Sequence, residues 1–327
     1  MFHCTVSAAP QSGIRCYTPP YPQFFLCRQL ARQLSVATYL CKVYFDCLGK
    51  MNTNLLVMLV VLCSSGGNAI TRREYRIPLP FTLEEYRIGH LWSTGKWSLL
   101  NTGGGEGVEV VVNEPYEEDG ESGHFTHKIF HLASKVPKVI RMLAPKGSLE
   151  IHEKSWNRFT EVKTVTSNPD YMKDGYHTTT HTRLVKAADC DQDNIFSDIS
   201  SDIDDVIHLD IVNDPIASSD YKVDEDPTKC DSGFGNLSPD WQKSEVRMCV
   251  HKLVEVEFHW FGLQGTVESR IQKVCPRFFR NLHRQMFCWT DNWIRLSIDD
   301  IRVWEDEVKD ELDKTRTIGE VRGMSEQ

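Results

Sequence analysis

The sequence predicts an α+β fold in which a curved, mostly antiparallel sheet packs against long helices. Period-two runs of strand-forming residues fill the middle of the 327-residue chain. A broad apolar stripe at helical spacing follows them and is suited to lying across a sheet. Strands and helices do not alternate regularly, as a parallel sheet would require, so an α+β arrangement is expected.

The net charge of −9 is concentrated in one segment. Between Asp189 and Asp226 the chain carries 13 acidic residues and a single lysine, so the remainder is nearly balanced. A nucleic-acid-binding protein needs a basic face or stripe, which this chain lacks. We therefore expect no nucleic-acid partner.

The 11 cysteines form two groups, six before residue 64 and five after residue 189, and none has CxxC spacing. A disulfide framework is unusual in a domain of this size, so we expect the later group to be free thiols or buried apolar side chains in a reducing compartment. The later group consists of Cys190, Cys230, Cys249, Cys275 and Cys288.

Residues 1–72 differ in composition from the remainder, and we predict a disordered extension or leader there, followed by one domain at residues 73–327. The apolar run Leu55–Cys63 is too short to span a bilayer. It is similar to the centre of a secretory signal starting at Met51, although it lies inside the chain and the Met-Asn-Thr-Asn start carries no positive charge. A leader on a cytoplasmic domain is the favoured interpretation, and secretion is the alternative.

The domain begins with an extended run, Glu74–Pro80, and a helix whose capping box starts at Thr82. The glycine-rich segment 101–107 lacks the Gly-Lys-Ser/Thr ending of a phosphate loop, so we interpret it as a flexible connection. A strand at Val108–Tyr116 and a hairpin loop at 117–123 follow.

The stretch Gly123–Asn157 reads as a strand, a short apolar helical turn closed by Pro145, and a second strand. Strand side chains alternate between two faces. One face carries Thr126, Lys128 and Phe130, and the other carries His127, Ile129 and His131. A buried lysine needs a partner, so the first face is predicted to line a cavity for a ligand that is partly polar and partly apolar.

Further strands are predicted at Val162–Ser167, Tyr176–Thr182, Val206–Val212 and Val250–Gly262. The strand at Tyr176–Thr182 places a tyrosine and three threonines on one face: Tyr176, Thr178, Thr180 and Thr182. The strand at Val250–Gly262 places a lysine among apolar residues on one face: Lys252, Val254, Val256, Phe258 and Trp260.

The chain ends in helices. An apolar stripe runs from Val267 to Trp293, and Pro276 within it is expected to kink or interrupt the helix. A second capping box at Ser297 opens the last helix, where Glu305 lies at the border of the apolar face.

Catalytic and metal-binding patterns are weak. His127 and His131 share a strand face, but no cysteine or carboxylate cluster in the sequence completes a ligand set, so we expect no metal. Hydrolase, Walker and Rossmann motifs are absent from the sequence. Cys288 and His283 lie in the apolar stripe and are interpreted as core residues, so we do not expect an enzyme.

Several segments resemble class I phosphatidylinositol transfer proteins in register, from about Arg73 to the C-terminus. They are residues 102–116, 126–137, 141–145, 151–157 and 283–289. The resemblance implies a StAR-related, helix-grip fold enclosing one phospholipid as cargo, without a cofactor. It also implies a monomer that exchanges phosphatidylinositol and phosphatidylcholine between membranes, in the cytoplasm and transiently at membranes of the Golgi or ER type.

The resemblance also implies site residues. Inositol contacts fall on Thr126, Lys128, Asn157 and Glu305, and contacts on the phosphate side fall on Thr164, Thr182 and Lys252. The membrane-docking pair corresponds to Trp260 and Phe261. A candidate regulatory phosphorylation site falls at Ser232, although the basic residues that surround it in the family are replaced here.

Two alternatives share this cavity fold. A lipid sensor would present phosphatidylinositol to a kinase without net transfer. An enzyme, such as a cyclase or hydrolase, would convert a supplied lipid into product.

Overall fold

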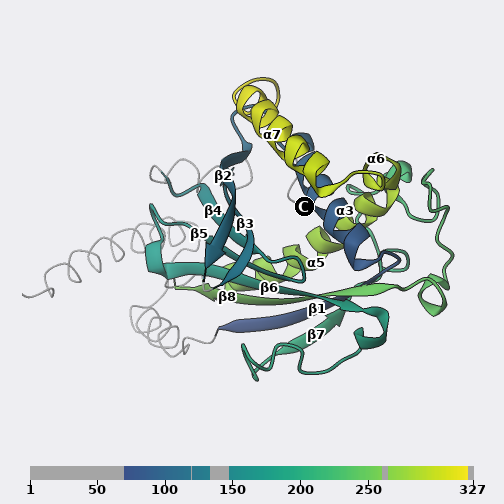
Figure 1. Ribbon diagram of the computed structural model, residues 1–327. Coiled ribbons are helices and arrows are strands. Elements are labelled where there is room, and N and C mark those ends of the chain that lie inside the picture. The colour runs from purple at the N-terminus through teal and green to yellow at the C-terminus, as the bar shows by residue number, and fades with distance from the viewer. Residues whose placement is uncertain (1–69, 119, 133–146, 260–263, 323–327) are drawn as a thin grey trace, which may run out of the picture. The chain divides into compact units, whose positions relative to one another are not determined.

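The computed structural model describes residues 70–118, 120–132, 147–259 and 264–322 (Figure 1). They belong to one compact unit, Gly66–Gln327. The leader predicted around Met51 and the helical turn before Pro145 lie outside the described residues. The division of the chain between residues 72 and 73 stays a prediction.

In the described part of the chain, eight strands form one sheet in the order β2, β3, β4, β5, β6, β8, β1, β7 (Figure 1). Neighbouring strands run antiparallel except β1 and β7, so the predicted α+β class with a mostly antiparallel sheet is confirmed. The strands are β1 (Thr71–Leu79), β2 (Gly107–Glu118), β3 (Glu121–His131), β4 (Glu150–Asn157), β5 (Glu161–Ser167), β6 (Tyr176–Lys186), β7 (Asp205–His208) and β8 (Met248–Phe258).

Two of the helices begin at the capping boxes that the sequence predicts. The Thr82 hydroxyl accepts a hydrogen bond from the Glu85 backbone N–H at 3.2 Å, and the Glu85 carboxylate accepts one from the Thr82 N–H at 2.7 Å. Ser297 and Asp300 form the same arrangement. The helices are α3 (Leu83–Leu100), α5 (Gln264–Cys288), α6 (Thr290–Trp293) and α7 (Ile298–Thr315), with single 3-10 turns η2 (Lys173–Gly175), η3 (Ala187–Asp189), η4 (Val223–Glu225) and η5 (Trp241–Lys243).

The core lies between the sheet and α5. Tyr75 of β1 is fully buried, its ring centroid lies 5.4 Å from that of Phe279, and its hydroxyl donates to Gln272 Oε1 at 2.9 Å. Trp293 of α6 is also fully buried and lies so close to Gly89 of α3 that an added Cβ would meet its ring at 2.8 Å. A glycine at this point allows the helix and the indole to pack together.

Helix α7 covers the other end of the sheet. Val308 and Leu312 of α7 pack against Val108 and Val110 of β2 in a separate buried cluster. Figure 1 shows α7 lying beside α3, and the rings of Trp92 and Trp304 stack between these helices at a centroid distance of 5.6 Å. Helix α7 is therefore fixed both to β2 and to α3.

One prediction about the later cysteines is wrong. Cys230 and Cys288 form a disulfide across 58 residues of chain, because the loop carrying Cys230 packs against the end of α5. In the same region, Asp226 lies 3.5 Å from the Arg284 guanidinium of α5. The other three, Cys190, Cys249 and Cys275, are free thiols as predicted.

Of the two outcomes predicted for Pro276, interruption of the helix is wrong, since α5 continues on both sides of this residue. A second local prediction also needs correction. The strand predicted at Val206–Val212 ends at His208. The Asp210 carboxylate accepts hydrogen bonds from the backbone N–H groups of Val212 and Asn213, and the chain turns there. Among the described helices, none combines the length and apolar character needed to cross a bilayer.

Candidate functional site

A row of hydroxyl groups crosses one face of the sheet. Thr126 of β3 lies opposite Ser155, Ser155 lies opposite Thr164, and Thr164 lies opposite Thr180 of β6. Residues paired directly across strands point to the same face. The Ser155 and Thr164 hydroxyls are 3.1 Å apart, so the row includes a direct hydrogen bond.

A second row on the same face runs beside the first. Asn157 of β4 lies opposite Val162, which lies opposite Thr182, and Thr182 lies opposite Lys252 of β8. Lys128 belongs to the next row, opposite Glu153. The register therefore brings to one face all six sheet residues for which lipid contacts were predicted.

Helix α5 covers this face at β8. The Lys252 ammonium lies 5.2 Å from the centre of the Phe279 ring and donates a hydrogen bond to the Thr182 hydroxyl at 3.0 Å. Burial lowers the pKa of Lys252 from its ordinary value of 10.5 to about 8. Glu153, on the same face of the sheet, acts in the opposite direction and raises this pKa, but burial has the larger effect.

Histidines beside Lys252 are held neutral. The Tyr86 hydroxyl lies 3.2 Å from His283 Nε2, and His283 Nδ1 donates to the Phe279 carbonyl at 2.6 Å, so Nε2 is the acceptor. Burial, with a smaller effect of Lys252, lowers the pKa of His283 to about 3. Burial also lowers the pKa of His90 far below its ordinary value. The positive charges that act on His90 are therefore those of two lysines, Lys252 and Lys128.

Glu305 reaches the sheet from α7. Its carboxylate accepts a hydrogen bond from Asn113 Nδ2 at 3.2 Å and pairs with Arg302 one turn earlier. Asn113 lies opposite Thr126 in the β2–β3 register. Folding therefore brings the carboxylate from the last helix to the strand pair that carries the first hydroxyl of the row.

Asn157 lies at the edge of a cavity of about 550 Å³ between the β2–β3 hairpin, α3 and α7. Its Oδ1 accepts a hydrogen bond from the Phe159 N–H at 3.0 Å. Arg87 and Arg302 contribute to the same cavity. The polar end of the site is therefore continuous with a space large enough for a small-molecule group.

Comparison with known proteins identifies the family to which this chain belongs. A family model described as phosphatidylinositol transfer protein matches residues 70–310. The chain belongs to this family. The mouse phosphatidylinositol transfer protein beta isoform is 44% identical over 270 residues, which cover 77% of this chain and 97% of that protein.

More distant relatives carry the same name. Phosphatidylinositol transfer protein 1 of Dictyostelium discoideum is 39% identical over 250 residues, covering 74% of this chain and 94% of its own length. Mouse membrane-associated phosphatidylinositol transfer protein 1 is 36% identical over 247 residues, which are 72% of this chain and only 20% of that protein. The family suggested by the sequence is confirmed, and these relatives are named as transfer proteins, not as enzymes.

Three further site residues were predicted away from the sheet face. Two of them, Trp260 and Phe261, are outside the described residues. Ser232 is only 8% exposed, and its hydroxyl donates to the Gly235 carbonyl at 3.2 Å. A kinase would have to displace this loop, which the disulfide and the bond from Gly233 N–H to Asp291 hold against α5 and α6.

Sequence reasoning missed two polar residues of this face, Asn113 and Ser155. It placed Thr180 on the same face as Thr182 but assigned it no lipid contact. Period-two alternation provides a signal for Ser155, two residues before Asn157. Asn113 has no local signal, because its partner Glu305 is 192 residues away in the chain.

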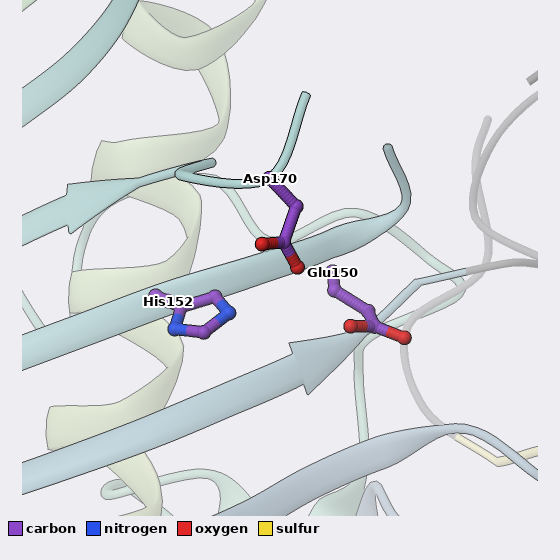
Figure 2. Close-up of side chains that lie close together, drawn as sticks. All are labelled: Glu150, His152 and Asp170. Atoms are coloured by element: carbon purple, nitrogen blue, oxygen red, sulfur yellow. The ribbon is translucent and has the colours of Figure 1, made fainter. Parts of the chain in front are cut away.

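A histidine–carboxylate cluster lies on the opposite face of the sheet. Figure 2 shows the side chains of Glu150, His152 and Asp170, whose ligand atoms all lie within 4.8 Å of one another. His127 Nε2 lies 3.0 Å from His152 Nδ1, which leaves His152 Nε2 for another partner. One imidazole and two carboxylates suit a divalent transition metal. The sequence did not reveal this set, because the turn after β5 brings in Asp170.

Proposed function

We propose that this protein is a phospholipid transfer protein that encloses one phosphatidylinositol or phosphatidylcholine molecule and exchanges it between membranes. The observation that carries the proposal is a hydroxyl-lined sheet face on which the buried Lys252 donates to Thr182 beneath α5. A lipid phosphate is the kind of group that an ammonium and hydroxyls bind together. Family membership and the names of the relatives support the same function.

Enclosure follows from the energetics of the cargo. Moving an acyl chain into water costs about 0.8 kcal/mol per CH₂, so exposing two chains would cost more than roughly 20 kcal/mol. A carrier must therefore provide an apolar interior and open only at a membrane. We place this exchange in the cytoplasm, at membranes of the ER or Golgi type, with the protein acting as a monomer.

Head-group selection is assigned to two sets of residues. The inositol set consists of Thr126, Lys128, Asn157 and Glu305, and the phosphate set of Thr164, Thr182 and Lys252. Inositol offers hydroxyls to the first set, whereas choline offers none. A buried polar group without its partner costs about 1–3 kcal/mol, so the two head groups are distinguished at the inositol set.

The test is transfer of each lipid between vesicles by single variants. Lys128→Ala and Glu305→Gln should lose phosphatidylinositol transfer and retain phosphatidylcholine transfer, because only the first lipid needs these contacts. Lys154→Ala is the matched control, since this exposed lysine adjoins Ser155 but lies on the other face of β4. Equal loss of both lipids in the two test variants would refute the head-group assignment.

Membrane docking is assigned to Trp260 and Phe261 on the basis of the resemblance. Aromatic side chains favour the bilayer interface. Replacing both with alanine should slow transfer of both lipids while the purified protein retains its bound lipid, as native mass spectrometry can show. Unchanged association with vesicles would contradict this role.

A further inference from the structure

The histidine–carboxylate cluster of Glu150, His152 and Asp170 lies away from the proposed lipid site. His152 of β4 is paired with Ile129, and successive strand residues point to opposite faces, so His152 lies on the face opposite to that of Lys128. Figure 2 shows the Asp170 carboxylate and one ring nitrogen of His152 turned toward Glu150, and one ligand atom from each residue lies within 4.8 Å of the other two. The cluster is thus a separate group of metal-ligating side chains.

The spacing and the charge of the cluster both suit a divalent cation. Zinc bonds to nitrogen and oxygen are about 2.0–2.2 Å long, so two atoms bound to one ion lie roughly 3–4 Å apart, and small side-chain rotations would close the cluster on an ion. Within the described part of the chain, no lysine or arginine pairs with Glu150 or Asp170, and the ion pair recorded for Glu150 is with His131. A cation between the two carboxylates would remove their mutual repulsion.

His131 of β3 supplies a fourth candidate ligand. Its Nε2 lies 2.8 Å from Glu109 Oε2, and because a carboxylate only accepts, Nε2 carries the proton of the neutral ring. Nδ1 then holds a free lone pair and lies 3.9 Å from Glu150 Oε1, which is too long for a hydrogen bond. Two acceptors that face each other across this gap could share a metal ion. A histidine ligand commonly donates its other N–H to a carboxylate, as His131 does to Glu109.

His127 supports His152 in a similar way. His127 Nε2 and His152 Nδ1 are 3.0 Å apart, so one of these nitrogens donates to the other. When His152 Nδ1 is the donor, its Nε2 is unprotonated and can bind a metal ion beside the two carboxylates. The hydrogen bond therefore allows His152 to adopt the tautomer that a metal ligand needs.

A buried asparagine holds the two carboxylate-bearing segments together. Asn168 is 1% exposed, and its Nδ2 donates to the backbone carbonyls of Gly147 and Glu150 at 2.9 and 2.8 Å. Its Oδ1 accepts from the Tyr171 N–H at 2.9 Å and shapes the turn that carries Asp170. A Cβ at Gly147 would lie 2.8 Å from the Asp170 Cβ, so the glycine allows this close approach. The ligands are therefore positioned by the fold itself.

We propose that His131, Glu150, His152 and Asp170 bind one divalent transition-metal ion of the zinc type. Two imidazoles and two carboxylates are ligands that Zn²⁺ accepts, and four protein ligands complete its tetrahedral shell. Such a closed site is structural, because it leaves no position for a substrate. The ion would link β3, β4 and the turn after β5 on the face away from the lipid, so the inference does not depend on the proposed function.

The experiment titrates the full chain with Zn²⁺ in a calorimeter after treatment with a chelator and its removal. The wild type should bind the ion, and Asp170→Asn and His152→Gln should each weaken this binding by about tenfold or more, since each removes a ligand. Glu109→Gln should weaken it by roughly 10–100-fold through His131. Asp174→Asn and His208→Gln, at exposed positions outside the cluster, are the matched controls and should bind Zn²⁺ as the wild type does.

Two further measurements make the result decisive. Thermal unfolding without metal should be the same for wild type and Asp170→Asn, which shows that the variant folds, and Zn²⁺ should raise the midpoint of the wild type alone. The absorption spectrum of the Co²⁺ form should show weak visible bands without the strong near-ultraviolet band of a thiolate ligand. Absence of Zn²⁺ binding by the wild type, full binding by both ligand variants, or a thiolate band that assigns the ion to cysteines would each overturn the inference. Lipid transfer is not a readout here, so its failure would overturn only the proposed function.

Discussion

Replacing Lys252 with methionine should stabilise the lipid-free protein at neutral pH. Burial lowers the pKa of this lysine from 10.5 to about 8. Each pKa unit corresponds to about 1.4 kcal/mol, so keeping the ammonium charged in the folded state costs roughly 3 kcal/mol. Methionine has a similar length and carries no charge, so Lys252→Met should raise the free energy of unfolding by about 2–3 kcal/mol at pH 7.

The pH dependence makes this prediction specific. Between pH 8 and about 10.5 the unfolded wild type binds a proton that the folded wild type has lost, so wild-type stability rises with pH relative to the variant. Urea unfolding at pH 7 and pH 10 measures this difference, which should shrink toward zero at the higher pH. Lys163→Met, at an exposed position of β5, should show no such trend. Equal stability of Lys252→Met and wild type at pH 7 would refute the reasoning.

Other predictions concern the scaffold. Cys230→Ser removes the disulfide to Cys288 and should lower the free energy of unfolding by about 2–4 kcal/mol under oxidising conditions, with no difference after reduction. Gly89→Ala drives a methyl group into a buried indole and should destabilise by about 1–3 kcal/mol, whereas Gly265→Ala, with open space around it, should stabilise slightly; thermal unfolding of both checks this. Leu312→Ala empties the buried contact of α7 with β2 and should cost about 2–5 kcal/mol in urea unfolding.

Strand alternation predicted much of the sheet face correctly. Thr126 and Lys128 lie on one side of β3, and Thr182 lies opposite Lys252, because period two is a local property of extended backbone. Capping boxes were equally reliable, since Thr82 and its glutamate are three residues apart. Features encoded within a few residues of one another could therefore be predicted without the fold.

Features that depend on distant segments could not be predicted. Cys230 and Cys288 carry no pairing signal, and only the packing of a loop on α5 brings them together. Arg87 and Arg158 resemble ordinary surface cations in the sequence, and their common cavity exists only after α3 and the β4–β5 turn have met. Asp170 approaches His152 for the same reason. Predicting these sites requires the relative placement of elements, which hydrophobic periodicity does not contain.

The phosphate set and the inositol set perform different tasks in the proposed exchange. Lys252 lies under α5 with a threonine as its hydrogen-bond partner. We propose that it binds the phosphate, a group common to all phospholipids. Its effect on affinity should therefore be shared by phosphatidylinositol and phosphatidylcholine. Lys128 and Glu305 are proposed to bind ring hydroxyls that only inositol lipids possess. Because the shared and selective contacts come from different strands and helices, a substitution can change head-group preference without removing the capacity to carry a lipid.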